Sequence, residues 1–183
     1  MKKYEFTGET KEIRLLFRTA TLHRIRATVA FGIVEVGDLG GWIEKEENLS
    51  HEGKAWVWGN AKVCGDAKVW GNAKVCGDAE VWGNAEVWGN AEVWGNAEVF
   101  SASHVLVIGA IGSRNDFTTF YRDKDNEITV KCGCFLGKID RFLEKVTQTH
   151  GDSKYALVYR AAVEVAKLQI DLSGEAPKDA DEE

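Results

Sequence analysis

The chain has 183 residues, of which 44% are hydrophobic and 28% are charged, so it is long enough to bury a core and polar enough to stay in solution. Its formal net charge is −6, and the acidic segment 173–183 contributes most of that charge, so the remaining body is nearly neutral. A nearly neutral body excludes the broad positive field that duplex nucleic acid requires, and no apolar stretch approaches the about 20 residues of a membrane span.

The first residues and the cysteines favour the cytoplasm. The segment MKKYEFTGETKEIRLLF has neither the uninterrupted apolar region nor the cleavage site of a signal peptide. Cys64, Cys76, Cys132 and Cys134 match neither a disulfide framework nor the two CxxC pairs of a zinc site. We therefore expect a cytoplasmic protein with reduced thiols and without a bound metal or cofactor. We also expect the segment 173–183 to be disordered and solubilising.

Residues 1–50 read as short strands, and we expect them to form a small β cap. The expected strands are Tyr4–Phe6, Ile13–Phe17, Leu22–Thr28 and Ile33–Val36, and the turn Gly37–Trp42 follows them. Several arginines cluster in this cap, namely Arg14, Arg18, Arg24 and Arg26. We interpret them as a solvated strand face, with a contact to an anion or a nucleic acid as the alternative.

A six-residue repeat occupies the middle of the chain. From Val57 the sequence reads VWGNAK, VCGDAK, VWGNAK, VCGDAE and then VWGNAE three times. Each hexad supplies one short strand and one corner of a left-handed parallel β-helix, and three hexads make one triangular coil. Degraded hexads on both sides extend the predicted β-helix to 51–111, which gives about three coils in a mainly β fold.

Alternation along each hexad assigns its side chains to the inside or the outside. Ala61 and Val63 point inward with their equivalents, and Lys62 points outward, because the opposite phase would bury every lysine and glutamate. Residues three hexads apart then stack on one another. The predicted pairs of opposite charge, which support the register, are Lys62 over Glu80, Lys68 over Glu86 and Lys74 over Glu92.

Large aromatic side chains remain on the outer faces. The predicted rows are Trp58–Cys76–Trp94, Cys64–Trp82–Phe100 and Trp70–Trp88–Leu106. Exposed aromatic rows usually mark an interface, so we expect a homo-oligomer. Its predicted interface consists of Trp58, Trp70, Trp82, Trp88, Trp94 and Phe100. Packing against the chain's own C-terminal segment and stacking of a ligand are the alternatives.

Residues 112–172 are expected to form a separate domain with a hairpin and two helices. The strand Val105–Ile111 leads into the turn Gly112–Asp116. The predicted hairpin has strands Phe117–Tyr121 and Ile128–Cys132 around the turn Asp123–Asn126. Apolar residues at helical spacing predict helices over Ile139–Thr149 and Ser153–Ile170.

The hairpin and the turn before it carry the candidate ligand-binding residues, which combine guanidinium, hydroxyl and aromatic groups. The set is Ser113, Arg114, Asn115, Thr118, Thr119, Tyr121, Arg122 and Lys131. Such groups suit a small ligand that bears a phosphate or a carboxylate. Cys132 and Cys134 could form a redox or nucleophilic pair, but nothing in the sequence places His150 beside them, so we interpret them as buried and structural. We predict no catalytic residue.

Two runs resemble a known group of proteins: LHRIRATVAFGIVEVGDLGGWIEKEENLSHEGKAWVWGNAKV, and VLVIGAIGSRNDFTTFYR with VKCGCFLGKIDRFLEKVTQTHGDSKYA. They are similar to hexapeptide-repeat proteins of bacteriophages and prophages, often labelled polymer-forming, with relatives in enterobacteria. The resemblance covers nearly the whole chain. It implies a left-handed β-helix that is often trimeric and varies in its number of coils, and it implies no catalytic residues.

Three functions are therefore weighed. The first is a non-enzymatic phage accessory protein, a homotrimer in the host cytoplasm that binds a nucleotide-like anion or a host defence factor, and so serves in evasion of anti-phage defence. The second is a hexapeptide-repeat acyltransferase, which would need a histidine such as His51 or His104 at a subunit edge. The third is a structural or virion spacer.

Overall fold

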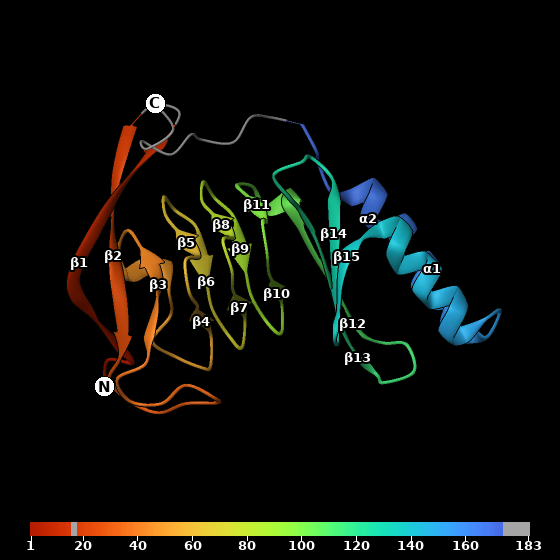
Figure 1. The fold of residues 1–183 in the computed structure, drawn as a ribbon, viewed down its shortest axis with the longest axis horizontal. Coiled ribbons are helices and arrows are strands. Elements are labelled where there is room, and N and C mark those ends of the chain that lie inside the picture. Colours follow the sequence, from red (N-terminus) through yellow and green to blue (C-terminus); the bar gives the residue numbers. More distant parts are fainter. Residues whose placement is uncertain (16–17, 174–183) are drawn as a thin grey trace.

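The computed structural model describes residues 1–15 and 18–173. Figure 1 shows three parts in a row, which are an N-terminal hairpin, a stack of coils and a C-terminal sheet covered by two helices. The coils are built from two-residue strands joined by corners. These strands are β4 (Trp56–Val57), β5 (Lys62–Val63), β6 (Lys68–Val69), β7 (Lys74–Val75), β8 (Glu80–Val81), β9 (Glu86–Val87), β10 (Glu92–Val93) and β11 (Glu98–Val99).

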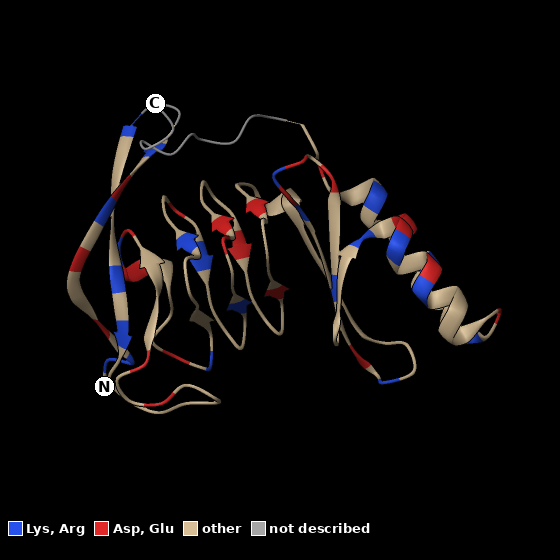
Figure 2. Cartoon of the chain, viewed as in Figure 1, with Lys and Arg blue, Asp and Glu red and all other residues tan. Residues whose placement is uncertain are grey.

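The coils form the predicted parallel β-helix. Strands three apart in the chain pair in parallel and define three faces, with β5, β8 and β11 on one, β4, β7 and β10 on the second, and β6 and β9 on the third. Lys62 pairs with Glu80, Lys68 with Glu86 and Lys74 with Glu92, so the predicted register is confirmed. Figure 2 shows the change from lysine to glutamate along the stack.

The interior of the β-helix holds only the small side chains that the hexad predicts. Each repeat alanine and valine from Ala61 to Val99 is almost fully buried in one continuous core. The corners bring backbones close together. At Gly71 φ is +72°, and an added Cβ would lie 3.1 Å from the nitrogen of Gly89 one coil below, so only glycine fits without strain.

The N-terminal cap is a long antiparallel hairpin rather than a set of short strands. Strand β1 (Tyr4–Leu15) pairs with β2 (Arg18–Ala27) on both sides of a register shift between Phe6 and Thr10, and residues 16–17 of the predicted strand lie outside the described residues. The prediction was wrong at two further places. Residues 33–36 form a turn region, whereas the predicted turn contains strand β3 (Leu39–Ile43), which joins β2 to β5 and starts the β-helix before residue 51.

The β-helix also ends earlier than predicted. After β11 a short 3-10 helix, Ala102–His104, interrupts the coil, and β12 (Val105–Ile111) turns away to pair antiparallel with β13 (Asp116–Arg122). Leu106 therefore does not extend the Trp70–Trp88 row but packs against the C-terminal core. Periodicity alone missed this break because Val105 and Val107 still fit the alternating pattern.

The C-terminal sheet has four antiparallel strands. The predicted turn at 112–116 and the strand β14 (Ile128–Cys132) are confirmed, and a further strand, β15 (Phe135–Lys138), continues the sheet. Helices α1 (Ile139–His150) and α2 (Lys154–Gln169) match the predicted helices. They cover one face of the sheet, and the other face closes the last coil (Figure 1). Among the described residues, no helix is long and apolar enough to span a membrane.

Candidate functional site

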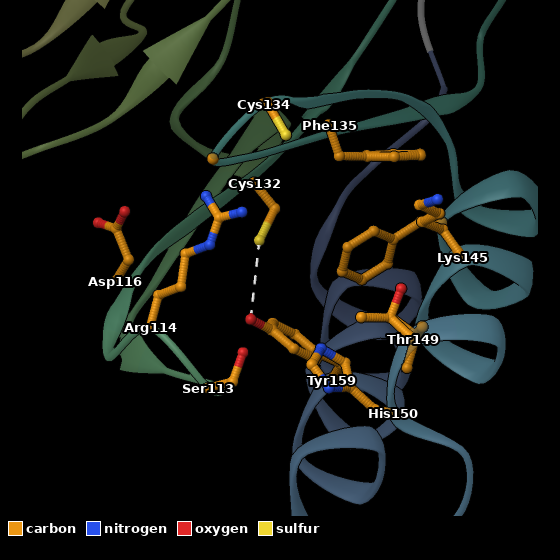
Figure 3. A pocket seen from close by; sticks show the side chains of 13 residues that line it. Ser113, Arg114, Asp116, Cys132, Cys134, Phe135, Lys145, Thr149, His150 and Tyr159 are labelled. Carbon is orange, nitrogen blue, oxygen red and sulfur yellow. Dashed lines mark hydrogen bonds between the residues drawn. The ribbon is translucent and has the colours of Figure 1, made fainter.

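A cavity of about 300 Å³ lies between the C-terminal sheet and the two helices (Figure 3). Its wall combines basic, hydroxyl, thiol and aromatic side chains. The lining residues are Ser113, Arg114, Asp116, Cys132, Gly133, Cys134, Phe135, Phe142, Lys145, Val146, Thr149, His150 and Tyr159. Two of the predicted ligand-binding residues, Ser113 and Arg114, are therefore at this cavity.

Two turns and two helix faces bring the lining together. The turn between β12 and β13 supplies Ser113 and Arg114 on one side of the cavity, and α1 supplies Lys145 and His150 on the other (Figure 3). Tyr159 of α2 lies between them, and its ring stacks against the His150 imidazole with a centroid distance of 5.8 Å.

Two glycines allow the close approaches that shape this cavity. At Gly112 φ is +72°, and a Cβ added there would lie 1.9 Å from the Tyr159 hydroxyl oxygen. Gly133 has φ +56° at the first position of the two-residue turn that joins β14 to β15, where a left-handed residue is required. The Arg114 guanidinium lies over this glycine, because a Cβ added there would meet its Nη1 atom at 2.8 Å.

The basic groups of the cavity lack carboxylate partners. Within residues 1–15 and 18–173, Arg114, Lys145 and His150 form no ion pair. Asp116 also lines the cavity, but its Oδ1 atom accepts a hydrogen bond from the Phe117 backbone nitrogen at 2.7 Å. The cavity wall therefore combines two cations outside any ion pair, Arg114 and Lys145, with one carboxylate, Asp116, and hydroxyl groups, and the two cations suit an anion.

The prediction that Cys132 and Cys134 are buried is wrong. Cys132 is half-buried at the cavity wall, and Cys134, two residues later, is exposed. The Thr118 hydroxyl donates a hydrogen bond to the Cys132 sulfur at 3.3 Å, and the Tyr159 hydroxyl oxygen lies 4.0 Å from the same sulfur. Burial, together with the neighbouring Cys132, raises the pKa of Tyr159 to about 12, so this hydroxyl stays protonated at neutral pH.

The other predicted ligand-binding residues split between two faces of the sheet. Thr119 and Tyr121 face the last coil, where they bond to the backbone of Glu92 and Trp94. Lys131 pairs with the Glu92 carboxylate at 3.1 Å and lies over the Trp94 ring. These side chains close the end of the β-helix and do not reach the cavity.

Arg122, Asn115 and Thr118 complete the predicted set. Arg122 is only 1% exposed, and its guanidinium contacts Glu98 at 3.2 Å, Asn126 and the face of the Phe100 ring. Asn115 is exposed in the turn, with φ +52°. Thr118 does not line the cavity, but its hydroxyl donates a hydrogen bond to the sulfur of Cys132, which does.

A second cavity, of about 410 Å³, lies where the sheet meets the coils. It is polar, and its central carboxylate, Glu92, is already paired with Lys74 at 2.8 Å and with Lys131 at 3.1 Å. Burial opposes ionisation of Glu92, but hydrogen bonds from these two lysines hold its pKa below the usual value. Because its charges compensate one another, this cavity attracts anions less than the first one.

The aromatic rows are covered to different degrees by the chain itself. Trp82 stacks on Phe100 at 4.6 Å and packs against the β1–β2 hairpin, and Trp94 lies under the C-terminal sheet. Trp58 packs edge-on against Trp56 at the core margin. Only the third face leaves its pair open, since Trp70 and Trp88 stack at 5.5 Å and are 42% and 51% exposed.

Two histidines that an acyltransferase could use have structural roles. His104 is almost fully buried, and its Nδ1 atom accepts a hydrogen bond from the Phe100 backbone nitrogen at 3.2 Å. His51 stacks on Tyr4, and its Nδ1 atom accepts from the Lys3 nitrogen at 3.1 Å. In the part of the chain that the structure describes, no group of His, Cys, Asp and Glu has the arrangement of a metal site.

Sequence reasoning missed the residues that the helices contribute. Lys145, Thr149 and His150 lie on α1 beside its predicted apolar face, and the packing of α1 on the sheet places them in the cavity wall opposite Arg114. Tyr159 falls at an apolar position of the predicted helix Ser153–Ile170, so the sequence gives no separate signal for its hydroxyl. No protein-family model matches this chain, and no curated protein sequence matches it at a significant level.

Proposed function

We propose that this chain is a non-enzymatic accessory protein whose C-terminal cavity binds a small anionic, nucleotide-like ligand. The observation that carries the proposal is that Arg114, Lys145 and His150 line one cavity and form no ion pair in the described chain. A guanidinium and an ammonium group are the usual partners of phosphate oxygens.

The rest of the wall supports this class of ligand. Ser113 and Thr149 add hydroxyl groups next to the basic side chains, and Phe135 and Phe142, with ring centroids 5.2 Å apart, add an apolar side. A ligand with one charged end and one flat apolar end, as in a nucleotide, matches such a wall. The volume of about 300 Å³ is at the lower end of the range for small-molecule sites, which favours a mononucleotide or a small cyclic nucleotide.

In this proposal the β-helix multiplies the site by assembling several copies of the chain. The open Trp70–Trp88 pair on the third face is the surface that supports self-association, and a trimer is the assembly proposed. The similarity to phage proteins extends the proposal to a biological role, which is to sequester a host nucleotide signal or to block a host defence factor in the cytoplasm.

The proposal is tested by isothermal titration calorimetry of the full chain against a panel of linear and cyclic nucleotides. We expect at least one nucleotide to bind, and we expect Arg114→Ala and Lys145→Ala each to weaken binding by about tenfold to a hundredfold, the value of a hydrogen bond to a charged group. Arg141→Ala is the matched control, because Arg141 is an exposed residue of α1 outside the cavity lining. If no nucleotide binds, or if Arg141→Ala weakens binding equally, the proposal is wrong.

A further inference from the structure

We propose that Cys132 is a site of thiol–disulfide exchange with small anionic disulfides, and that Cys134 resolves the mixed disulfide that forms. The inference shares its cavity with the proposed nucleotide site and rests on the same positive charge, but it assigns a covalent chemistry that ligand binding does not require. It depends on the access to the two sulfurs, the groups around Cys132 and the turn that joins the two cysteines.

The four cysteines divide sharply by access. Cys64 and Cys76 are 2% and 8% exposed under the hairpin and on the β-helix wall, and burial raises the pKa of each thiol to about 12. Cys132 opens into the cavity and Cys134 is exposed to solvent. Reactivity of a thiol depends on access and on its surroundings, so the two C-terminal cysteines are the reactive pair, and the other two are internal controls.

Two hydroxyl groups contact the Cys132 sulfur, and two cations line the cavity into which it opens. The Thr118 hydroxyl donates to the sulfur at 3.3 Å, and the protonated Tyr159 hydroxyl lies 4.0 Å away. Arg114 and Lys145 line the same cavity and form no ion pair among the described residues. The same positive groups attract an anionic reagent, so reaction with a negatively charged disulfide is favoured over reaction with a neutral one.

The turn places Cys134 where it can attack the adduct. Cys132 and Phe135 face each other across the ladder of β14 and β15, and only Gly133 separates the two cysteines. Both cysteines line the cavity, and Figure 3 shows Cys134 at the turn and the Cys132 sulfur directed toward Tyr159. Gly133, with φ +56°, makes the chain reverse at this point, which keeps the two cysteines close in space.

The chemistry proceeds in two balanced exchanges. The deprotonated Cys132 sulfur attacks one sulfur of a disulfide R–S–S–R, a new S–S bond joins Cys132 to R–S, and the departing R–S⁻ takes up the proton that Cys132 lost. The Cys134 sulfur then attacks the Cys132 sulfur, which releases the second R–SH and leaves a Cys132–Cys134 disulfide. Two protein thiols are oxidised and one external disulfide is reduced to two thiols.

The test follows the reaction of the full native chain with two disulfide reagents by absorbance. The first is the dianionic 5,5′-dithiobis(2-nitrobenzoate), and the second is the neutral 2,2′-dithiodipyridine. We expect Arg114→Ala and Lys145→Ala each to slow the anionic reagent by about tenfold and to leave the neutral reagent nearly unchanged, because only the first reaction uses the positive field. Arg141→Ala should change neither rate.

Mass spectrometry separates the two steps. The native chain should release two equivalents of the coloured thiol and end two hydrogens lighter, whereas Cys134→Ser should stop as a mixed disulfide on Cys132. Cys132→Ser should abolish the charge-selective phase and leave only the slower reaction of Cys134. Equal slowing of both reagents by Arg114→Ala, or a charge-selective phase that survives Cys132→Ser, would overturn the proposal.

Failure of this proposal differs from failure of the nucleotide proposal. Thiol–disulfide exchange is measured without any nucleotide. If a chain that binds no nucleotide still reacts charge-selectively, the thiol proposal is supported and the nucleotide proposal is wrong. If the chain binds a nucleotide but reacts equally with both disulfide reagents, the nucleotide proposal stands and the thiol proposal is wrong.

Discussion

The Tyr121 hydroxyl bonds to both backbone groups of Trp94. It accepts a hydrogen bond from the Trp94 nitrogen at 3.3 Å and donates one to the Trp94 carbonyl oxygen at 3.0 Å. In the other coils the equivalent nitrogen bonds to the next coil, as the Trp70 nitrogen does to the Val87 oxygen at 3.1 Å, whereas the equivalent oxygen accepts from its own corner, as the Trp70 oxygen does from the Ala73 nitrogen at 3.4 Å. At Trp94 one side chain from the C-terminal sheet takes the place of the next coil for the nitrogen and of the corner nitrogen for the oxygen.

Removing this hydroxyl should therefore destabilise the end of the β-helix. We expect Tyr121→Phe to lower the free energy of unfolding by about 1–3 kcal/mol, since it leaves buried backbone groups unsatisfied while keeping the ring. Urea denaturation followed by circular dichroism measures the change. Tyr155→Phe is the control, because Tyr155 is half-buried on α2 and its hydroxyl makes no hydrogen bond within the described chain. An equal loss in both variants would contradict this role of Tyr121.

The stacked Lys62–Glu80 pair gives a prediction on register. Their side chains are 13% and 19% exposed and lie 2.7 Å apart on neighbouring coils. Lys62→Glu should lower the free energy of unfolding by about 1 kcal/mol, because it sets two carboxylates against each other. Exchanging the two residues, Lys62→Glu with Glu80→Lys, should restore most of the loss in the same urea measurement. A double exchange as unstable as the single one would show that the pair does not support the register.

The buried thiols of Cys64 and Cys76 predict a loss of stability in alkali. Burial raises the pKa of each from 9.0 to about 12. Between these values the unfolded thiols have lost their protons while the folded ones keep them, so the unfolded state binds fewer protons. The free energy of unfolding should then fall as the pH rises through this window, by up to about 1.4 kcal/mol per pH unit for each thiol.

Urea midpoints measured from pH 7 to pH 11 test this slope. The double variant Cys64→Ala/Cys76→Ala should show a shallower decline above pH 9 and a parallel curve below it. Some decline should remain, because burial also raises the pKa of Tyr4 and Tyr121. If the double variant declines as steeply as the native chain, the two thiols do not carry the effect.

The open Trp70–Trp88 pair predicts the state of assembly. Sedimentation velocity of the native chain should give the mass of a trimer, and Trp70→Ser/Trp88→Ser should shift it toward the monomer with an unchanged circular dichroism spectrum. Leu168→Ser is the matched control, since Leu168 is an apolar residue that is 89% exposed and lies on α2, outside the third face. A native chain that sediments as a monomer would remove self-association from the proposal.

The sequence allowed the β-helix to be predicted because its repeat is local and regular. Whether Ala61 and Val63 point inward depends only on alternation and on the need to keep Lys62 out of the core, and the structure agrees. Trp56 shows the limit of this reasoning. It occupies a lysine position of the hexad, but Tyr4 and Phe31 of the cap pack against it, so it is 1% exposed.

The candidate site was only partly predictable, because contacts between distant parts of the chain decide which side chains reach it. Ser113 and Arg114 lie together in sequence, and the turn that carries them could be recognised from Gly112. Arg122 looked similar in sequence, yet the way the sheet closes the last coil buries its guanidinium against Glu98. Contacts between distant elements decide such cases, and no period or motif in one sequence reports them.

The near-identical hexads of the β-helix determine the spacing and the relative orientation of the hairpin and the C-terminal sheet. Each coil contacts only its neighbours, and neighbouring coils repeat after 18 residues. Gain or loss of a whole coil would therefore change the separation of the hairpin and the C-terminal sheet by about 4.8 Å and keep their relative orientation. Gain or loss of a single hexad would instead rotate one end by a third of a turn. The number of VWGNAE units therefore determines both the separation and the relative rotation of the two ends, and both change in fixed steps.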